Sequence, residues 1–365
     1  MGFKCGIVGL PNVGKSTLFN ALTQTAAAQA ENYPFCTIEP NVGEVAVPEA
    51  RLKALADIAG SANVIPARMN FVDIAGLVKG ASQGEGLGNQ FLANIRETDA
   101  VVYVLRCFDD GDVTHVAGKV DPLADFETVE TELMIADLES LEKRRANVEK
   151  KAKSGDKEAK AQIALIDVAL AELQDGRPAR RAEIDEDQIK DWRMLQLLTS
   201  KPVMFVANVD EDSAATGNAY SAEVEARAKE EGAVCVIISA KIEAEIALLD
   251  EDEAQEYLEE LGLEEPGLSR LIHAGYELLG LQTYFTAGPK EARAWTIRKG
   301  WTAPKAAGVI HGDFERGFIR AETIAYDDYV ANKGEAGARD AGKLRQEGKD
   351  YVVADGDVML FKFNV

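Results

Sequence analysis

Near-continuous apolar runs in the first part of the chain predict parallel strands. The runs cover residues 4–10 (KCGIVGL), 70–76 (NFVDIAG) and 100–108 (AVVYVLRCF). Strands buried on both faces lose the polar alternation of half-exposed strands. Residues 41–47 (NVGEVAV) do alternate, which favours an edge strand, and apolar runs return at 202–210 and 233–241. The pattern predicts an α/β domain built on a mostly parallel sheet.

A different pattern separates the two groups of strands. Between residues 127 and 199, apolar side chains recur at roughly helical spacing and charged residues fill the opposite face; they include Val129, Leu133, Ala136, Leu138 and Leu141. Residues 154–156 (SGD) offer a break, after which the pattern resumes. We therefore expect a long antiparallel helical hairpin inserted into the α/β domain.

The pattern changes again near residue 280 and predicts a small α+β module. Residues 293–300 (RAWTIRKG) favour a strand and turn, and residues 302–311 (TAPKAAGVIH) a helix capped by threonine. A strand pair across Asp355–Gly356 is expected near the end. We predict three domains. The α/β domain spans 1–126 and 200–280, the helical insertion 127–199, and the last module 281–365.

Composition narrows the classes of protein that fit. The chain has 62 Asp and Glu against 40 Lys and Arg, and its net charge of -22 argues against nonspecific nucleic-acid coating. The basic stretch 143–160, with eight Lys and Arg against three Asp and Glu, is either an RNA contact or a solvated helix face. No apolar run approaches the ~18 residues of a membrane span. Four cysteines without a Cys-x-x-Cys pair fit a reducing cytoplasm.

Residues 9–17 (GLPNVGKST) match the phosphate-binding loop G-x-x-x-x-G-K-[ST], between a predicted strand and a predicted helix. Its glycines let backbone amides approach phosphates, and the helix N-terminus faces the anion. Lys15 is expected to reach the β- and γ-phosphates, Ser16 to ligate Mg²⁺, and Thr17 to contact the α-phosphate. The predicted nucleotide contacts of this loop are Asn12, Val13, Gly14, Lys15, Ser16 and Thr17.

Residues 73–76 (DIAG) end the next buried strand. Asp73 is placed to orient the magnesium shell through water, and the Gly76 amide to meet the γ-phosphate. Thr37, in YPFCTIEPN, is the candidate switch threonine that closes on Mg²⁺ and the γ-phosphate, or else an ordinary loop threonine.

The corner after residues 202–207 selects the base. A guanine-specific GTPase carries Asn-Lys-x-Asp there, but this chain has Asn208-Val209-Asp210-Glu211. The Asp accepts bonds from guanine N1–H and the 2-amino group, neither of which adenine offers, so losing it relaxes selection against adenine. Asn208 can still bond N7, and the Val209 carbonyl can accept from the adenine 6-amino group.

Residues 239–241 (SAK) end the last strand of the domain. The backbone of Ser239 and Ala240, with the stem of Lys241, can cradle a purine; the alternative is a strand-to-helix turn without a ligand.

The sequence offers several candidates for the group that positions the attacking water. Leu77 follows DIAG, where Ras-like enzymes carry Gln, and an apolar side chain cannot orient water. Another polar group, a potassium ion or a partner must then act. Asn12 is a candidate K⁺ ligand, or merely shapes its loop. His115 can swing in as a catalytic residue, or is a solvated loop histidine.

These residues together resemble the YchF family, the Obg-like ATPases. The resemblance runs along the whole chain and includes GLPNVGKST, YPFCTIEPN, FVDIAGLVKGASQGEGLGNQFL and GKDYVVADGDVMLFKFNV. It implies an OBG-type G domain interrupted by a helical coiled-coil domain, then a C-terminal TGS domain of β-grasp type. It also implies a preference for ATP over GTP and binding to ribosomes. Asn208–Glu211 and Leu77 match the family's altered motifs.

The sequence therefore predicts a slow, switch-like ATPase with Mg²⁺ in its site, acting in the cytoplasm with ATP, ADP and the ribosome as partners. Two alternatives stay open. One is a guanine-specific GTPase of the Obg type, and the other is a nucleotide-binding ribosome adaptor without significant turnover.

Overall fold

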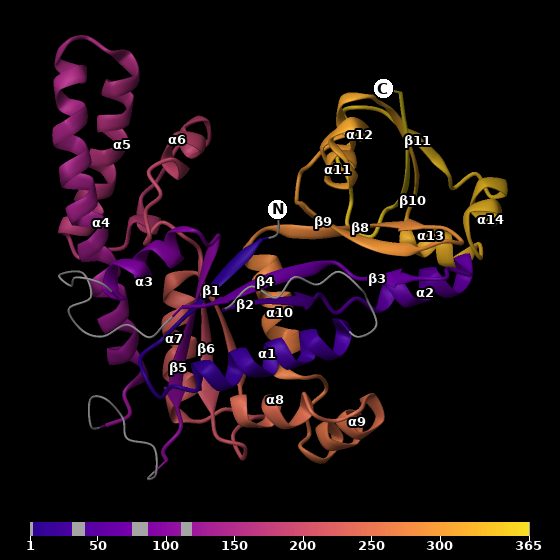
Figure 1. Ribbon diagram of the computed structural model, residues 1–365, viewed down its shortest axis with the longest axis horizontal. Coiled ribbons are helices and arrows are strands. Elements are labelled where there is room, and N and C mark those ends of the chain that lie inside the picture. The colour runs from indigo at the N-terminus through magenta and orange to yellow at the C-terminus, as the bar shows by residue number, and fades with distance from the viewer. Residues whose placement is uncertain (1–2, 31–40, 75–86, 111–118, 365) are drawn as a thin grey trace. The chain divides into compact units, whose positions relative to one another are not determined.

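The computed structural model describes residues 3–30, 41–74, 87–110 and 119–364 (Figure 1). By compactness the chain divides into two units. The first holds Phe3–Gly43 and Asn70–Leu271, and the second holds Glu44–Met69 and Ile272–Val365. The division falls inside two strands and one helix, so the chain passes between the units without a linker. The three domains expected from the sequence stay a prediction.

The first sheet explains where a ligand can bind. Its order, among the described residues, is β2-β4-β1-β5-β6-β7. Parallel pairing joins β1 to β4 and β5, and β6 to β5 and β7, as the apolar runs predicted. Because the chain builds outward from β1 in both directions, the crevice at the carboxyl end of β1 is the topological switch point. The strands are β1 (Lys4–Val8), β2 (Val42–Ala46), β4 (Arg68–Asp73), β5 (Ala100–Cys107), β6 (Val203–Val209) and β7 (Val234–Ile238).

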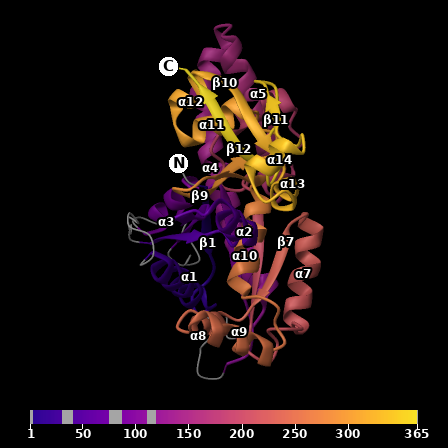
Figure 2. The same ribbon diagram turned by 90° about the vertical axis from the view of Figure 1, so that its right-hand side faces the viewer.

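Helices pack against this sheet. Helix α7 lies along β6 and β7, where Figure 2 shows it beside β7, and α1 packs against α8. In α8 the buried Glu243 carboxylate accepts from the backbone nitrogens of Gly267 (2.7 Å) and Leu268 (3.1 Å). Burial raises the pKa of Glu243, while these two bonds satisfy orphan donors at the start of α10. The helices are α1 (Lys15–Ala30), α3 (Leu87–Arg96), α7 (Ala219–Glu231), α8 (Ala240–Ile246), α9 (Glu251–Glu260) and α10 (Gly267–Leu278).

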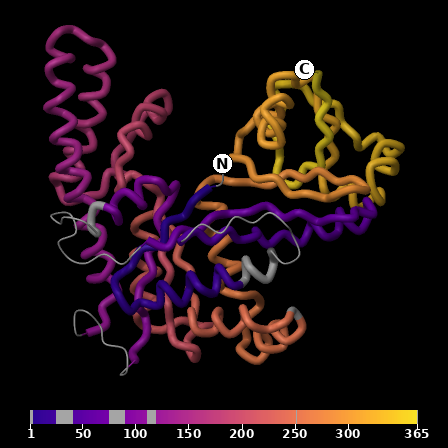
Figure 3. The backbone as a smooth tube through the Cα atoms, in the orientation of Figure 1, coloured from indigo at the N-terminus to yellow at the C-terminus, as the bar shows by residue number. Residues whose placement is uncertain are grey.

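The predicted helical hairpin is present. Helix α4 (Pro122–Lys153) is followed by α5 (Lys157–Gln174), and Figure 3 traces the turn between them. Asp156 caps α5 by accepting from the backbone nitrogens of residues 158 and 159 at 2.9 and 3.1 Å, which confirms the expected break at 154–156. Buried Leu141, Ile166 and Trp192 hold the hairpin to the returning segment. That segment contains two 3₁₀ turns, Ala179–Arg181 and Glu186–Gln188, and α6 (Ile189–Arg193).

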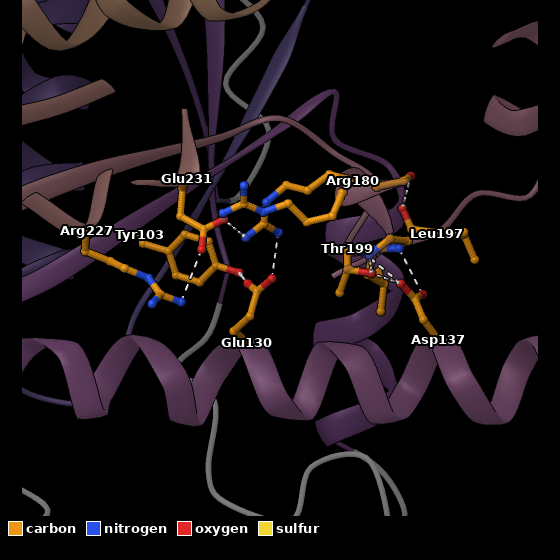
Figure 4. A network of polar contacts seen from close by, with 12 residues as sticks. Tyr103, Glu130, Asp137, Arg180, Leu197, Thr199, Arg227 and Glu231 are labelled. Carbon is orange, nitrogen blue, oxygen red and sulfur yellow. Dashed lines mark hydrogen bonds and ion pairs between the residues drawn. The ribbon is translucent and has the colours of Figure 1, made fainter. Parts of the chain in front are cut away.

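A buried polar network ties the root of the hairpin to the sheet (Figure 4). Glu130 of α4 accepts from the Tyr103 hydroxyl of β5 and from Arg180, and Arg180 also bonds Glu231 at the end of α7. Two turns further on, Asp137 accepts from the backbone nitrogens of Leu198 and Thr199, which precede β6, at 2.9 Å each. The hairpin root is therefore fixed by side chains from several elements.

The second unit carries a sheet of order β11-β10-β12-β8-β9-β3 among the described residues. Its strands are β3 (Val64–Ile65), β8 (Leu281–Ala287), β9 (Ala292–Arg298), β10 (Phe318–Ile324), β11 (Arg345–Glu347) and β12 (Val358–Phe363). Its helices are α2 (Ala50–Ala59), α11 (Ala303–Ile310), α12 (Gly312–Arg316), α13 (Tyr326–Ala331) and α14 (Glu335–Asp340). The predicted strand over residues 293–300 is β9, and Thr302 takes the N-cap position of α11, although its side chain makes no capping bond.

The expected strand pair across Asp355–Gly356 is wrong. Strand β12 pairs with β10 in antiparallel fashion, and with β8 only where Val358 lies opposite Phe285. The residues before the turn bond elsewhere, because the Tyr351 carbonyl accepts from Ala303 and the Val353 nitrogen donates to Trp301. A turn signal shows where a chain reverses, but the available strand edges decide the partner.

Two further findings concern membrane-spanning helices and cysteines. In the described ranges, no helix combines the length and apolar character that a bilayer crossing requires. Cys5, Cys107 and Cys235 are free cysteines, whereas Cys36 lies outside the described residues.

Candidate nucleotide-binding site

The loop of residues 9–14 joins β1 to α1 at the switch point of the first sheet. Asn12 and Gly14 adopt φ values of 64° and 89°, a region that L side chains rarely occupy. The Gly14 carbonyl then accepts the first helical bond, from Leu18 nitrogen at 3.0 Å. These turns bring the chain from the buried strand into the helix, so the N-terminus of α1 opens at the loop, as anion binding requires.

Gly14 must also be glycine because Asn208 approaches it closely. A Cβ atom built on Gly14 would lie 2.1 Å from Asn208 Nδ2. Gly9 is similarly crowded, since a Cβ there would lie 2.7 Å from the Val104 carbonyl oxygen. The glycines of the loop therefore permit close packing against β5 and β6 as well as an unusual backbone.

Lys15 and Asp73 form an ion pair at the start of α1 and the end of β4. Lys15 is buried and the Asp73 side chain is 20% exposed. The two residues are far apart in sequence, and the parallel pairing of Ile7 with Asp73 places the carboxylate at the same sheet edge as the loop. The structure thus brings together the cation and the carboxylate that the two motifs predicted as partners of a phosphate and a metal.

Asn208 braces the site from the end of β6. Its Nδ2 donates to the Val13 carbonyl at 2.9 Å, and its Oδ1 accepts from the Ala240 nitrogen at 2.9 Å. The side chain is buried, so these bonds form in a low-dielectric interior where polar groups need partners. The amide nitrogen carries two hydrogens and the Val13 bond uses one, so a bond to purine N7 stays compatible with this geometry.

Ser239, Ala240 and Lys241 form the turn from β7 into α8. The Ser239 hydroxyl is buried, and no described residue accepts or donates a hydrogen bond to it. Lys241 is exposed and its Nζ lies 2.7 Å from Glu211 Oε2. This hydrogen bond is the largest cause of the raised Lys241 pKa.

The other predicted contacts differ in exposure. Ser16 and Thr17 are exposed in the first turn of α1, whereas Val209 is buried at the end of β6. Four residues with predicted roles lie outside the described residues; they are Thr37, Gly76, Leu77 and His115.

Sequence reasoning missed two features beside the site. The Glu211–Lys241 pair joins residues 30 positions apart, and neither motif indicates the other's partner. The second feature is Arg106, fully buried in β5 opposite Asn208, which donates to the Phe108 carbonyl at 3.1 Å. The sequence signal for it was a charged residue inside the apolar run 100–108.

Comparison with known proteins finds two family models that match parts of the chain. A family model named YchF-GTPase_C, described as a protein of unknown function (DUF933), matches residues 281–364. A second model, MMR_HSR1, described as a 50S ribosome-binding GTPase, matches residues 4–135.

Whole-length relatives agree with these matches. The ribosome-binding ATPase YchF of Haemophilus ducreyi is 60% identical over 365 residues, with 100% of both chains covered. The protein of the same name from Bacillus subtilis is 54% identical over 367 residues, again with 100% of both chains covered. Among solved structures, the Schizosaccharomyces pombe YchF GTPase matches with a TM-score of 0.88 at 38% identity, covering 99% of this chain and 98% of that one.

Proposed function

The chain belongs to the YchF family, and on this premise we propose that it binds ATP in preference to GTP and hydrolyses it slowly with Mg²⁺. The observation that carries nucleotide binding is the pair of hydrogen bonds made by Asn208, whereas the proposed preference for ATP rests on Glu211 in place of the guanine-reading Asp. Asn208 links the phosphate-binding loop at Val13 to the base-side turn at Ala240 through two 2.9 Å hydrogen bonds. The proposed phosphate-binding and base-binding segments are thus joined through one side chain, and this supports a nucleotide that contacts both at once.

The phosphate side of the site rests on the loop of residues 12–17. Backbone amides of this loop and the N-terminus of α1, a helix of 16 residues, offer partial positive charge to the β- and γ-phosphates. Buried Lys15 adds a full charge, and Thr17 is the proposed contact of the α-phosphate. When nucleotide binds, we expect Lys15 to exchange Asp73 for phosphate oxygens, because a charge-assisted bond replaces the one it loses.

The donors present suit Mg²⁺, which prefers hard oxygen ligands and keeps several waters. Ser16 would supply a hydroxyl, Asp73 would act through water, and Thr37 is the proposed third group. The ion would neutralise charge on the β- and γ-phosphates. Asp73 lies at the end of β4 beside Lys15. We propose that it orients a water of the Mg²⁺ shell from this position once Lys15 has turned to the phosphates.

The base side of the site uses the ends of β6 and β7. We propose Asn208 as the N7 partner, the Val209 carbonyl as the acceptor for the 6-amino group, and Ser239 with Ala240 as the cradle of the ring. The Ser239 hydroxyl has no hydrogen-bond partner among the described residues, and this supports a ligand here, because a buried hydroxyl without a partner costs about 1–3 kcal/mol and binding can offset that cost.

Water positioning is proposed for His115, with Gly76 as an amide donor to the γ-phosphate. Asn12 is the proposed ligand of a K⁺ ion that would help to neutralise the phosphates.

The relatives are named as ribosome-binding, and we propose that this chain also binds the ribosome, in the cytoplasm, with its affinity set by the bound nucleotide. The basic stretch 143–160 is the proposed RNA contact, together with the last domain, 281–365. In the structure this stretch covers the end of α4, the turn and the start of α5. Lys150, Lys157 and Lys160 there are exposed, as phosphate contacts must be.

Competition binding of ATP and GTP, followed by single-turnover phosphate release, tests the proposal. We expect tighter ATP binding and slow release that ribosomes or K⁺ accelerate. A clear GTP preference would favour the Obg-type GTPase, and release at background under all conditions would favour the nucleotide-binding adaptor.

A further inference from the structure

The two acidic residues that follow Asn208 bind different groups. The Asp210 carboxylate accepts from the Ser213 backbone nitrogen at 2.9 Å and so closes the turn after β6. The Glu211 carboxylate instead lies 2.7 Å from Lys241 Nζ, on the turn that follows β7. The residue at the guanine-reading position is therefore directed toward a neighbouring segment of its own chain.

The side chains of this ion pair are exposed, but a buried hydrogen bond joins the two segments that carry them. The side chains of Lys241 and Glu211 are 68% and 42% exposed. Lys241 directly follows Ala240, whose nitrogen donates to Asn208 Oδ1, and Glu211 lies three positions after Asn208. Because Asn208 fixes both ends, the ammonium and the carboxylate meet with little loss of backbone freedom.

Other charges near Lys241 are more distant or otherwise engaged. Glu245 and Asp110 also raise the Lys241 pKa, but their effects are smaller than that of Glu211. The Glu245 carboxylate accepts from the Tyr257 hydroxyl at 2.5 Å. Glu211 is therefore the principal anionic partner of Lys241.

The length of the side chain matters at position 211. Aspartate there would bring its carboxylate to the Watson–Crick edge of a purine, where guanine offers two donors and adenine offers a lone pair at N1. Glutamate is one methylene longer, which lets its carboxylate reach Lys241. A carboxylate held at Lys241 neither accepts hydrogen bonds from guanine nor repels the N1 lone pair of adenine.

We propose that the Glu211–Lys241 ion pair selects adenine against guanine by holding the Glu211 carboxylate away from the Watson–Crick edge of the bound base. The inference rests on the proposed nucleotide site and deepens it, since it assigns Lys241 as a positioning residue for base choice. To read guanine, Glu211 would first have to give up its ammonium partner. The cost of that exchange falls on guanine alone.

Competition binding of ATP, GTP and ITP to the full chain tests the proposal. Lys241→Met removes the ammonium but keeps an aliphatic stem, and Lys241→Arg is the matched control that keeps the charge. We expect Lys241→Met to raise GTP affinity relative to ATP about threefold to fivefold, the size that loss of an exposed ion pair allows, since Glu211 becomes available for charge-assisted bonds to guanine. Lys241→Arg should keep the ratio of GTP to ATP affinity within about twofold of wild type, because the guanidinium retains a positive charge for Glu211. ITP, which lacks the 2-amino group, should gain less than GTP.

A double-substitution cycle separates the ion pair from a general effect of either residue. Glu211→Asp should itself favour GTP, because the shorter side chain no longer reaches Lys241. Adding Lys241→Met to Glu211→Asp should then change the GTP to ATP ratio little, which is the coupling expected of interacting residues.

The outcomes distinguish this inference from the function on which it rests. An unchanged GTP to ATP ratio in Lys241→Met, with ATP binding intact, would overturn the role of the ion pair alone. A wild-type chain that binds neither nucleotide would overturn the proposed function and this inference with it.

Discussion

Arg180 Nη1 lies 2.6 Å from Glu130 Oε1, and this ion pair joins the segment that returns from the helical hairpin to the first half of α4. Both side chains are nearly buried, at 11% and 6% exposure. Arg180 also reaches Glu231, at 3.2 Å, so one guanidinium serves two carboxylates on different helices (Figure 4). The hairpin is thereby anchored at its root to the elements that surround β5.

Arg180→Ala should lower the free energy of unfolding by about 3–5 kcal/mol, because the buried Glu130 carboxylate loses the guanidinium that pairs with it, whereas Glu231 keeps its contacts with Arg181 and Arg227. Arg181→Ala is the matched control. Arg181 contacts the same Glu231 at 3.1 Å, but its side chain is 41% exposed, so we expect a loss below about 1 kcal/mol. Urea unfolding measures both, and equal losses would contradict the anchoring role of Arg180.

Tyr103→Phe should reduce stability in a way that depends on pH. Burial, and then the neighbouring Glu130 carboxylate, raise the Tyr103 pKa well above its usual value. The folded chain thus holds this proton more tightly than the unfolded chain, so the contribution of Tyr103 is complete below about pH 10 and is lost as pH rises further.

Urea unfolding of wild type and Tyr103→Phe at about pH 8 and about pH 11 checks the sign. We expect wild type to be more stable by about 1–3 kcal/mol at the lower pH, with a smaller difference at the higher pH. A difference that grows with pH would show that Tyr103 does not act through its proton.

Ser239→Ala should have opposite effects on stability and on nucleotide binding. The buried Ser239 hydroxyl has no partner among the described residues, so its removal should leave the nucleotide-free protein equally stable or about 1 kcal/mol more stable. If the hydroxyl contacts the bound base or a water beside it, ATP affinity should fall several-fold. Thermal unfolding and ATP titration measure the two effects, and a loss of stability without nucleotide would indicate a missed structural partner.

Gly14→Ala should destabilise the chain by about 3 kcal/mol or more and abolish nucleotide binding. Both the positive φ of 89° and the 2.1 Å approach of Asn208 Nδ2 oppose a Cβ there. Gly155→Ala is the control, since Gly155 has a φ of 96° but, its chain neighbours aside, no described residue has a heavy atom within 4 Å of the added Cβ. It should cost only about 1–2 kcal/mol. Similar losses at the two sites would mean that backbone strain, and not the Asn208 contact, requires glycine at position 14.

The sequence by itself determined the local elements and the candidate residues of the phosphate side. Apolar runs identified β1, β4, β5, β6 and β7, and the SGD break separated α4 from α5, because periodicity and turn residues act over a few positions. The G-x-x-x-x-G-K-[ST] pattern located Lys15 and Ser16 for the same reason. The turn signal at Asp355–Gly356 did not predict the partner of β12, since strand pairing depends on which sheet edges are available.

Only the tertiary structure decided how distant side chains meet. Asn208 bonds Val13 and Ala240 across 195 and 32 positions, Glu211 bonds Lys241 across 30, and Arg180 bonds Glu130 across 50. Each choice depends on the order of strands in the sheet and on which polar groups are buried together. A one-dimensional pattern shows that a carboxylate is present, but the packed chain determines whether it faces a base, a metal or another residue of its own fold.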